Sequence, residues 1–308
     1  MKCVLLFVAV IGAVLSGTPT SDCAVTAIGA TPLSDVGVSP YPGIPLGLYP
    51  GGLNVVPPSH LNAGLVLASG IKPRKANGQP HPNGRIGLVS IGMSNARQEF
   101  AAFMAVPAPN TRVTFINGAQ GGVMADEWAD PTCLCWGRLD GYVAAAGLTA
   151  AQVSVVWIKL VNEFPAAWPD GVNALHADLA VVVQALAVRF PNLTLAYLSS
   201  RTYGGYATTL QSPEPHAYDS AFAVRGLIEA QLNGDLPYSG AGRIAPWLAW
   251  GPYLWADGLT PRSDGLTWAC SDFETDGGHP GPSGESKVAD LLRQFFLTHP
   301  TTMGWFIG

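Results

Sequence analysis

Five short apolar runs follow one another along the chain after residue 84, and segments of helical periodicity lie between them. A run that is apolar at both odd and even positions is typical of a strand buried on both faces of a sheet. The last run contains a proline, Pro246, which confines that strand to a sheet edge or places the proline at its start. The runs are Arg85–Gly92, Arg112–Asn117, Val153–Lys159, Leu193–Ser199 and Ala245–Gly251.

Apolar residues spaced three and four apart predict helices at Asn173–Phe190, Ala217–Leu232 and Ser283–Leu297. Ser283 follows a proline and is the expected N-cap of the last helix. A further helix is expected directly after Ser94. Alternating strands and helices predict an α/β protein, a three-layer α/β/α sandwich with a central, mainly parallel sheet of about five strands. Binding sites in such sheets form at the carboxyl ends of the strands.

The N-terminal part of the chain differs in composition from the rest. Residues 1–20 have the layout of a secretory signal peptide: Lys2, then an apolar run from Cys3 to Leu15, then small and polar residues. The run is shorter than the ~20 residues of a membrane span, so a single-pass anchor is the weaker reading. Residues 21–84 are rich in Gly and Pro, and we expect an irregular arm packed on a domain of residues 85–308.

Composition narrows the class of protein. Only 12% of residues are charged, against about 25% in typical globular proteins. The chain has 36 Gly and 26 Pro, and its net charge of −5 argues against nucleic-acid binding. These features suit a secreted, periplasmic or extracellular protein without a stable membrane anchor, in which disulfides hold the loops.

Cleavage of the signal peptide would remove Cys3 and leave four cysteines: Cys23, Cys133, Cys135 and Cys270. An even number in an exported chain favours disulfides, with three possible pairings. Because Cys133 and Cys135 are so close in sequence, we expect each to pair with Cys23 or Cys270 rather than with the other. A zinc site is the weaker alternative, since the spacing lacks the usual two-residue gap.

Residues able to carry chemistry follow the predicted strands. Ser94 follows the first strand and opens a helix, so its backbone N–H lies where negative charge is favoured. The second strand is followed by Gly121-Gly122, whose amides can approach a ligand closely. Asn162 comes after the third strand. Each feature alone is more often an ordinary helix cap or turn.

The strongest local pattern lies just before the last helix. Asp276 stands three residues before His279 in a Gly-rich loop, with a second acid, Asp272, further upstream. An aspartate at this spacing can accept a hydrogen bond from Nδ1 of the histidine and leave Nε2 free to act as a base.

Taken in order, four segments resemble the SGNH, or GDSL-type, hydrolase superfamily. They are Gly92–Ser94, Ala119–Gly122, Asn162 and Asp276–His279, and the resemblance covers about residues 85–298. The forms of the first two segments are closest to the branch of sialate O-acetylesterases and related carbohydrate acetylesterases. The resemblance implies the flavodoxin-like SGNH fold for the domain.

The resemblance also implies roles for individual residues. Ser94 would be the nucleophile, His279 the base and Asp276 the acid that orients it. The amides of Ser94 and Gly122 and the side chain of Asn162 would form the oxyanion hole, with Gly121 replacing Gly122 if the turn is shifted by one residue. No metal or organic cofactor is required.

Three further residues are candidate substrate contacts, each with a structural alternative. Arg201 follows the fourth strand and could bind a carboxylate or hydroxyl of the substrate, or form a salt bridge. Glu163 could orient substrate, although structural hydrogen bonding is the commoner role of such a residue. Trp128 is one of several tryptophans that could stack on a sugar ring near the strand ends, unless they belong to the core.

The sequence therefore predicts a secreted serine esterase that hydrolyses acyl esters, with acetyl esters of a carbohydrate as the expected substrates. Met93 and Leu160 depart from the residues usual in the superfamily motifs. They motivate an alternative, a catalytically silent secreted carbohydrate-binding protein on the same fold. A lipase is a further alternative, but no amphipathic insertion is long enough to form a lid.

Overall fold

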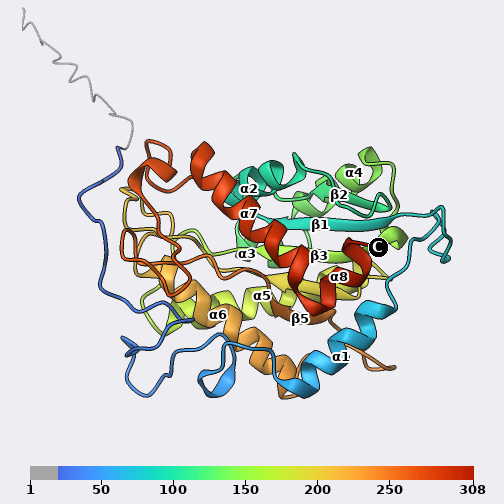
Figure 1. The fold of residues 1–308 in the computed structure, drawn as a ribbon, viewed down its shortest axis with the longest axis horizontal. Coiled ribbons are helices and arrows are strands. Elements are labelled where there is room, and N and C mark those ends of the chain that lie inside the picture. Colours follow the sequence, from blue (N-terminus) through green and yellow to red (C-terminus); the bar gives the residue numbers. More distant parts are fainter. Residues whose placement is uncertain (1–19) are drawn as a thin grey trace, which may run out of the picture.

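A five-stranded parallel sheet forms the centre of the computed structural model, which describes residues 20–308 (Figure 1). All neighbouring strands run parallel, in the order β2-β1-β3-β4-β5. Each predicted run contains one strand, and the run with Pro246 forms the edge strand that begins after the proline. The strands are β1 (Ile86–Gly92), β2 (Val113–Asn117), β3 (Val153–Lys159), β4 (Leu195–Leu198) and β5 (Trp247–Trp250).

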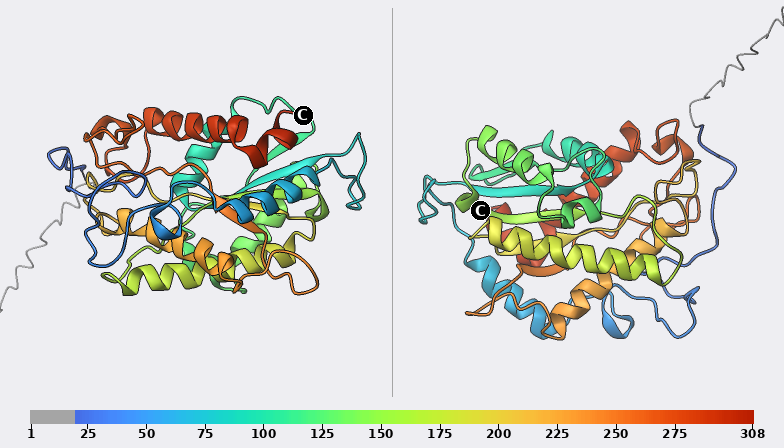
Figure 2. Two further views of the ribbon diagram at one scale, coloured as in Figure 1. Left: turned by 60° about the horizontal axis from the view of Figure 1, so that its bottom comes forward. Right: turned by 180° about the vertical axis from the view of Figure 1, so that it is seen from behind.

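Helices cover both faces of the sheet, which confirms the predicted three-layer α/β/α class (Figure 2). On one side α2 (Ser94–Met104) packs on α7 (Pro282–Thr298), which also contacts α8 (Pro300–Phe306). On the other side α5 (Asp170–Arg189) packs between α3 (Ala125–Ala129) and α6 (His216–Leu232), and α4 (Leu134–Ala145) contacts β2 and α3. Every residue of β1 and β3 is buried, as expected of strands covered on both faces.

The segment before the sheet packs on the domain and contains a helix, α1 (Pro58–Ser69), where the sequence predicts no regular element. This helix has no apolar stripe, because its buried residues are His60 and Gly64. Gly64 lies directly against the ring of Trp247. The His60 Nε2 atom lies 2.8 Å from the carbonyl oxygen of Leu248. Close contact with Trp247 and a hydrogen bond attach α1, together with the partly buried Leu67 and Ala68. The hydrophobic pattern does not report the first two contacts.

The disulfides differ from the expected pairing. Cys23 pairs with Cys270, and Cys133 pairs with Cys135. The expectation that Cys133 and Cys135 pair with other cysteines is therefore wrong. Cys133 has an extended backbone and caps α4, while Cys135 lies in the first helical turn. The chain turns between them and brings their Cα atoms to 5.2 Å, within the usual range of about 4.4–6.8 Å.

The N-cap of α7 differs from the prediction. It is Gly281, not Ser283, whose hydroxyl donates to the carbonyl of Ser271 and the carboxylate of Asp272 instead.

Within residues 20–308, α5 alone is long and apolar enough to cross a membrane by length and composition. Its apolar stripe is buried in the protein, as in a core helix.

A buried carboxylate, Glu214, anchors the long segment between β4 and α6. It accepts hydrogen bonds from the backbone N–H of Gly204 at 2.9 Å, from the backbone N–H of Tyr218 at 3.0 Å and from the indole Nε1 of Trp255 at 2.7 Å. Burial raises the pKa of Glu214 to about 7, because the hydrogen bonds only partly offset the loss of solvation.

Stability should therefore depend on the ionisation of Glu214. Its pKa rises from 4.5 to about 7 on folding, so its contribution is fully present below about pH 4.5 and is lost as the pH rises through 7. The shift corresponds to roughly 3 kcal/mol. We expect the free energy of unfolding, measured by urea titration, to fall from pH 4.5 to pH 8 by about that much more in the wild type than in Glu214→Gln. Equal pH dependence of the two proteins would contradict this assignment.

Candidate active site

Ser94, His279 and Asp276 form a continuous hydrogen-bonded chain at the carboxyl edge of the sheet. Ser94 is the first residue of α2, directly after β1. Its Oγ lies 2.7 Å from Nε2 of His279, a residue 185 positions away in the chain. The Nδ1 of the same ring lies 2.5 Å from Oδ2 of Asp276. The fold thus brings together three residues that the sequence analysis names from two distant segments of the chain.

The loop that carries His279 is held in place by its own backbone. The Oδ1 of Asp276 accepts hydrogen bonds from the N–H groups of Gly278 and His279, both at 2.9 Å. Gly277 has φ +68° and lies directly against the carbonyl of Tyr206, so a side chain at this position would be strained and would clash. The side-chain amide of Asn95 donates to the carbonyl of Gly278 at 2.7 Å. This last bond ties the loop to the helix that carries the serine.

These contacts also set the charge of the acid. Burial acts to raise the pKa of Asp276, but hydrogen bonds from the imidazole and N–H of His279 and from the N–H of Gly278 outweigh it and lower the pKa below its ordinary value. The carboxylate is therefore ionised at neutral pH and accepts the Nδ1–H of His279. The Nε2 atom is then left to accept a proton from Ser94.

Asp272, the other acid of this segment, has a structural role. It forms an ion pair with Lys287 of α7, with a distance of 2.5 Å from Nζ to Oδ2. The neighbouring Cys270 is joined to Cys23 by a disulfide. The segment before His279 is thereby fixed to the last helix and to the N-terminal arm.

Three backbone N–H groups are candidates for the oxyanion hole. Within residues 20–308, the N–H groups of Ser94, Gly121 and Gly122 donate to no other backbone group outside regular helices and strands. A Cβ built on Gly121 would lie 3.9 Å from that of Ser94, whereas one on Gly122 would have no neighbour within 4 Å. Gly122 has φ +70° and supplies the turn. The geometry thus favours Gly121 over Gly122 as the residue beside Ser94.

Asn162 lines the same cavity, and its side chain is fixed by two contacts. Its Nδ2 donates to the carboxylate of Asp178 at 2.8 Å, and its Oδ1 accepts from the N–H of Asp126 at 3.2 Å. One of the two amide hydrogens is thus used by Asp178, and the second has no partner within residues 20–308.

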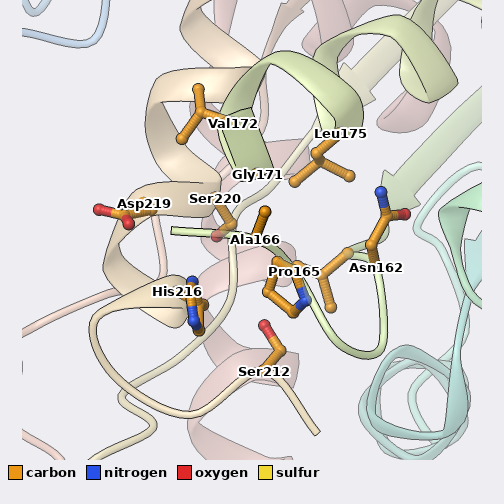
Figure 3. Close-up of a pocket in the computed structure, with 11 residues that line it drawn as sticks. Asn162, Pro165, Ala166, Gly171, Val172, Leu175, Ser212, His216, Asp219 and Ser220 are labelled. Carbon is orange, nitrogen blue, oxygen red and sulfur yellow. The ribbon is translucent and has the colours of Figure 1, made fainter. Parts of the chain in front are cut away.

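A small cavity lies at Ser94, with about 340 Å³ of non-atom space that includes open solvent. Its lining contains two apolar side chains, Met124 and Val161, together with Gly278 and a set of polar residues. The polar lining residues are Ser94, Asn95, Asn162, Glu163, Arg201, Thr209, Gln211, Ser212, Asp276 and His279. A second cavity adjoins it and shares Val161, Asn162 and Ser212 (Figure 3).

The three residues predicted to contact substrate have different surroundings. Glu163 lines the cavity, and its carboxylate accepts a hydrogen bond from Gln211 at 2.7 Å. Arg201 lines it from the segment after β4. Trp128 has no exposed surface and packs edge-on against Trp136. The expectation that Trp128 contacts substrate is therefore wrong, because its ring is part of the core beneath α3.

A buried ion pair near the site was not predicted from the sequence. Lys159, the last residue of β3, contacts Glu99 of α2 at 2.5 Å, and both side chains have no exposed surface. Burial raises the pKa of Glu99 and lowers that of Lys159, while their mutual attraction opposes both shifts. The available signal was a lysine at the end of an otherwise apolar run and a glutamate in the helix that follows the first strand.

Removing one partner of this pair should be costly, because it leaves an uncompensated buried charge. We expect Glu99→Gln to lower the free energy of unfolding by about 3–5 kcal/mol, and the double variant Glu99→Leu/Lys159→Met to recover most of that loss. Chemical denaturation of the three proteins measures both effects. A single variant as stable as the wild type would show that the pair is dispensable.

Comparison with known proteins returns no match among family models and none among curated proteins. Solved structures do match. A protein assigned to the SGNH hydrolases from Slackia heliotrinireducens is 17% identical, with a TM-score of 0.36, covering 69% of this chain and 99% of its own. A carbohydrate esterase of family 3 from Talaromyces cellulolyticus is 13% identical, with a TM-score of 0.41, covering 67% and 94%. A protein assigned as an acylhydrolase from Bacteroides fragilis is 13% identical, with a TM-score of 0.39, covering 78% and 97%.

Proposed function

We propose that this protein is a serine esterase that hydrolyses short acyl esters, acetyl esters above all, of a polar substrate. The observation that carries the proposal is the chain of hydrogen bonds from Ser94 through His279 to Asp276. A serine becomes nucleophilic when an adjacent base, itself oriented by a third group, accepts its proton.

In the proposed reaction, Ser94 Oγ attacks the ester carbonyl carbon while Nε2 of His279 takes the hydroxyl proton. The ionised Asp276 stabilises the imidazolium that forms. The negative charge on the carbonyl oxygen is met by the N–H groups of Ser94 and Gly121 and by the second amide hydrogen of Asn162. The alcohol leaves with the proton from His279. Water, activated by the same histidine, then hydrolyses the acyl-enzyme and restores Ser94.

The lining of the cavity supports a small acyl group on a polar alcohol. Met124 and Val161 supply a limited apolar surface, enough for a methyl group, and the polar residues around them suit the hydroxyls of a carbohydrate. A lipase would bind a long acyl chain, and Met124 and Val161 are the only two apolar side chains among the residues that line this cavity. The tryptophans give no support for sugar stacking, because most of those near the strand ends are buried.

Two features favour an active enzyme over a silent binding protein. Met93 and Leu160, the departures that motivate the silent alternative, are buried in the core. Neither residue is part of the hydrogen-bonded chain.

Export is part of the proposal as well, since the two disulfides suit an oxidising compartment and the first segment has the layout of a signal peptide.

The proposal predicts the effect of substitutions in the chain of hydrogen bonds. Ser94→Ala and Asp276→Asn should each lower kcat for 4-nitrophenyl acetate by about 10³-fold or more, because one removes the nucleophile and the other removes the charge that orients the base. Release of 4-nitrophenolate measures the rate.

Asp272→Asn is the matched control, because it changes an acid of the same loop that does not contact His279. It should reduce kcat far less than Asp276→Asn at a temperature where both variants are folded. Full activity of Ser94→Ala would refute the proposed function.

A further inference from the structure

Arg201 lines the cavity, and part of its hydrogen-bonding capacity is unused. The residue is 5% exposed, and it lines the same cavity as Ser94 and His279. Its Nε is buried without a hydrogen-bond partner, and its guanidinium forms no ion pair within residues 20–308. Unpaired buried charges are costly and therefore rare in folded proteins.

The carboxylates near Arg201 only partly offset the cost of burying its charge. Burial lowers the pKa of Arg201, and the charges of Glu99, Glu214 and Asp276 oppose this shift. Each of them is engaged elsewhere: Glu99 with Lys159, Glu214 with the loop before α6, and Asp276 with the His279 loop. These carboxylates favour the charged guanidinium, but within residues 20–308 none of them forms a hydrogen bond or ion pair with it.

The other polar groups that line the cavity are compatible with a bound hydrogen-bond acceptor such as a carboxylate. Ser212 Oγ is also buried there without a partner. Figure 3 shows Ser212 in the lining of the adjoining cavity, and the same residue also lines the cavity at Ser94. Glu163 is the acid lining the cavity outside the hydrogen-bonded chain, and its Oε1 is engaged by Gln211. The cavity lining thus includes two groups without a hydrogen-bond partner within residues 20–308, the charged donor Arg201 Nε and the hydroxyl of Ser212.

We propose that Arg201 binds a carboxylate of the substrate, so that the ester hydrolysed at Ser94 belongs to an acidic sugar of the uronic-acid type. A guanidinium offers parallel N–H donors that match the two oxygens of a carboxylate, and a neutral hydroxyl uses only part of this capacity. Ser212 Oγ can donate to the same group. This inference rests on the proposed esterase function and specifies the alcohol part of its substrate.

The test compares two substrates that differ in one charge. Mono-acetylated methyl glucuronoside carries the carboxylate, and the corresponding mono-acetylated glucuronamide replaces it with a neutral group of the same shape. Charge-assisted hydrogen bonds suggest that the wild type will favour the acid in kcat/KM by about 10- to 100-fold. Acetate release measures both reactions.

Variants assign the preference to Arg201. In Arg201→Gln the ratio of kcat/KM for acid over amide should fall to about one, and Arg201→Lys should keep part of it. Arg225→Gln is the matched control, since Arg225 donates to backbone carbonyls of the N-terminal arm away from the cavity, and it should keep the full ratio. If Arg201→Gln fails to fold, the wild-type ratio and the lysine variant still decide the question.

A binding experiment separates this inference from the proposed function. Calorimetry with Ser94→Ala should show tighter binding of methyl glucuronoside than of its amide, and Ser94→Ala/Arg201→Gln should show no difference. Absence of any difference in Ser94→Ala, or equal wild-type rates for both substrates, would overturn the role of Arg201. Ser94-dependent hydrolysis of both substrates at equal rates would leave the esterase proposal intact while removing this one.

Discussion

The parallel direction of all five strands is the constraint on which the site depends. Because each strand ends at the same edge, the segments that follow β1, β2, β3 and β4 converge there, although they are far apart in sequence. Ser94, Gly121, Asn162 and Arg201 all come from such segments. A reversed strand would move its loop to the opposite edge and remove one functional group from the cavity.

His279 does not follow a strand, so its position needs other support. The loop that carries it is joined to α2 through Asn95, to α7 through Asp272 and Lys287, and to the N-terminal arm through Cys23 and Cys270. Most of these attachments are covalent, ionic or backbone-directed. Although the chain has few charged residues, several of them lie in or beside the loop that carries His279 and hold it next to Ser94. The arm, which is rich in Gly and Pro, contributes to the site by holding this loop.

The sequence is sufficient to predict what depends on local pattern. Strands buried on both faces read as continuous apolar runs, and the three residues of the hydrogen-bonded chain lie in short, recognisable segments. The pairing of Cys133 with Cys135 and the helix α1 were not predictable, because both depend on local backbone geometry and close contacts rather than on apolar periodicity. The burial of Trp128 and the choice of Gly121 over Gly122 depend on side-chain and turn packing. The Lys159–Glu99 pair required knowing which helix face covers β3.

The central claim is that His279 activates Ser94 as a nucleophile. The most direct measurement is mass spectrometry of peptides from protein treated with diisopropyl fluorophosphate, which phosphorylates activated serines and releases fluoride. The account predicts one modification per chain, on the peptide that contains Ser94, and a large loss of that modification in His279→Ala. An unmodified Ser94 in the wild type, or equal modification of Ser94 in His279→Ala, would contradict it.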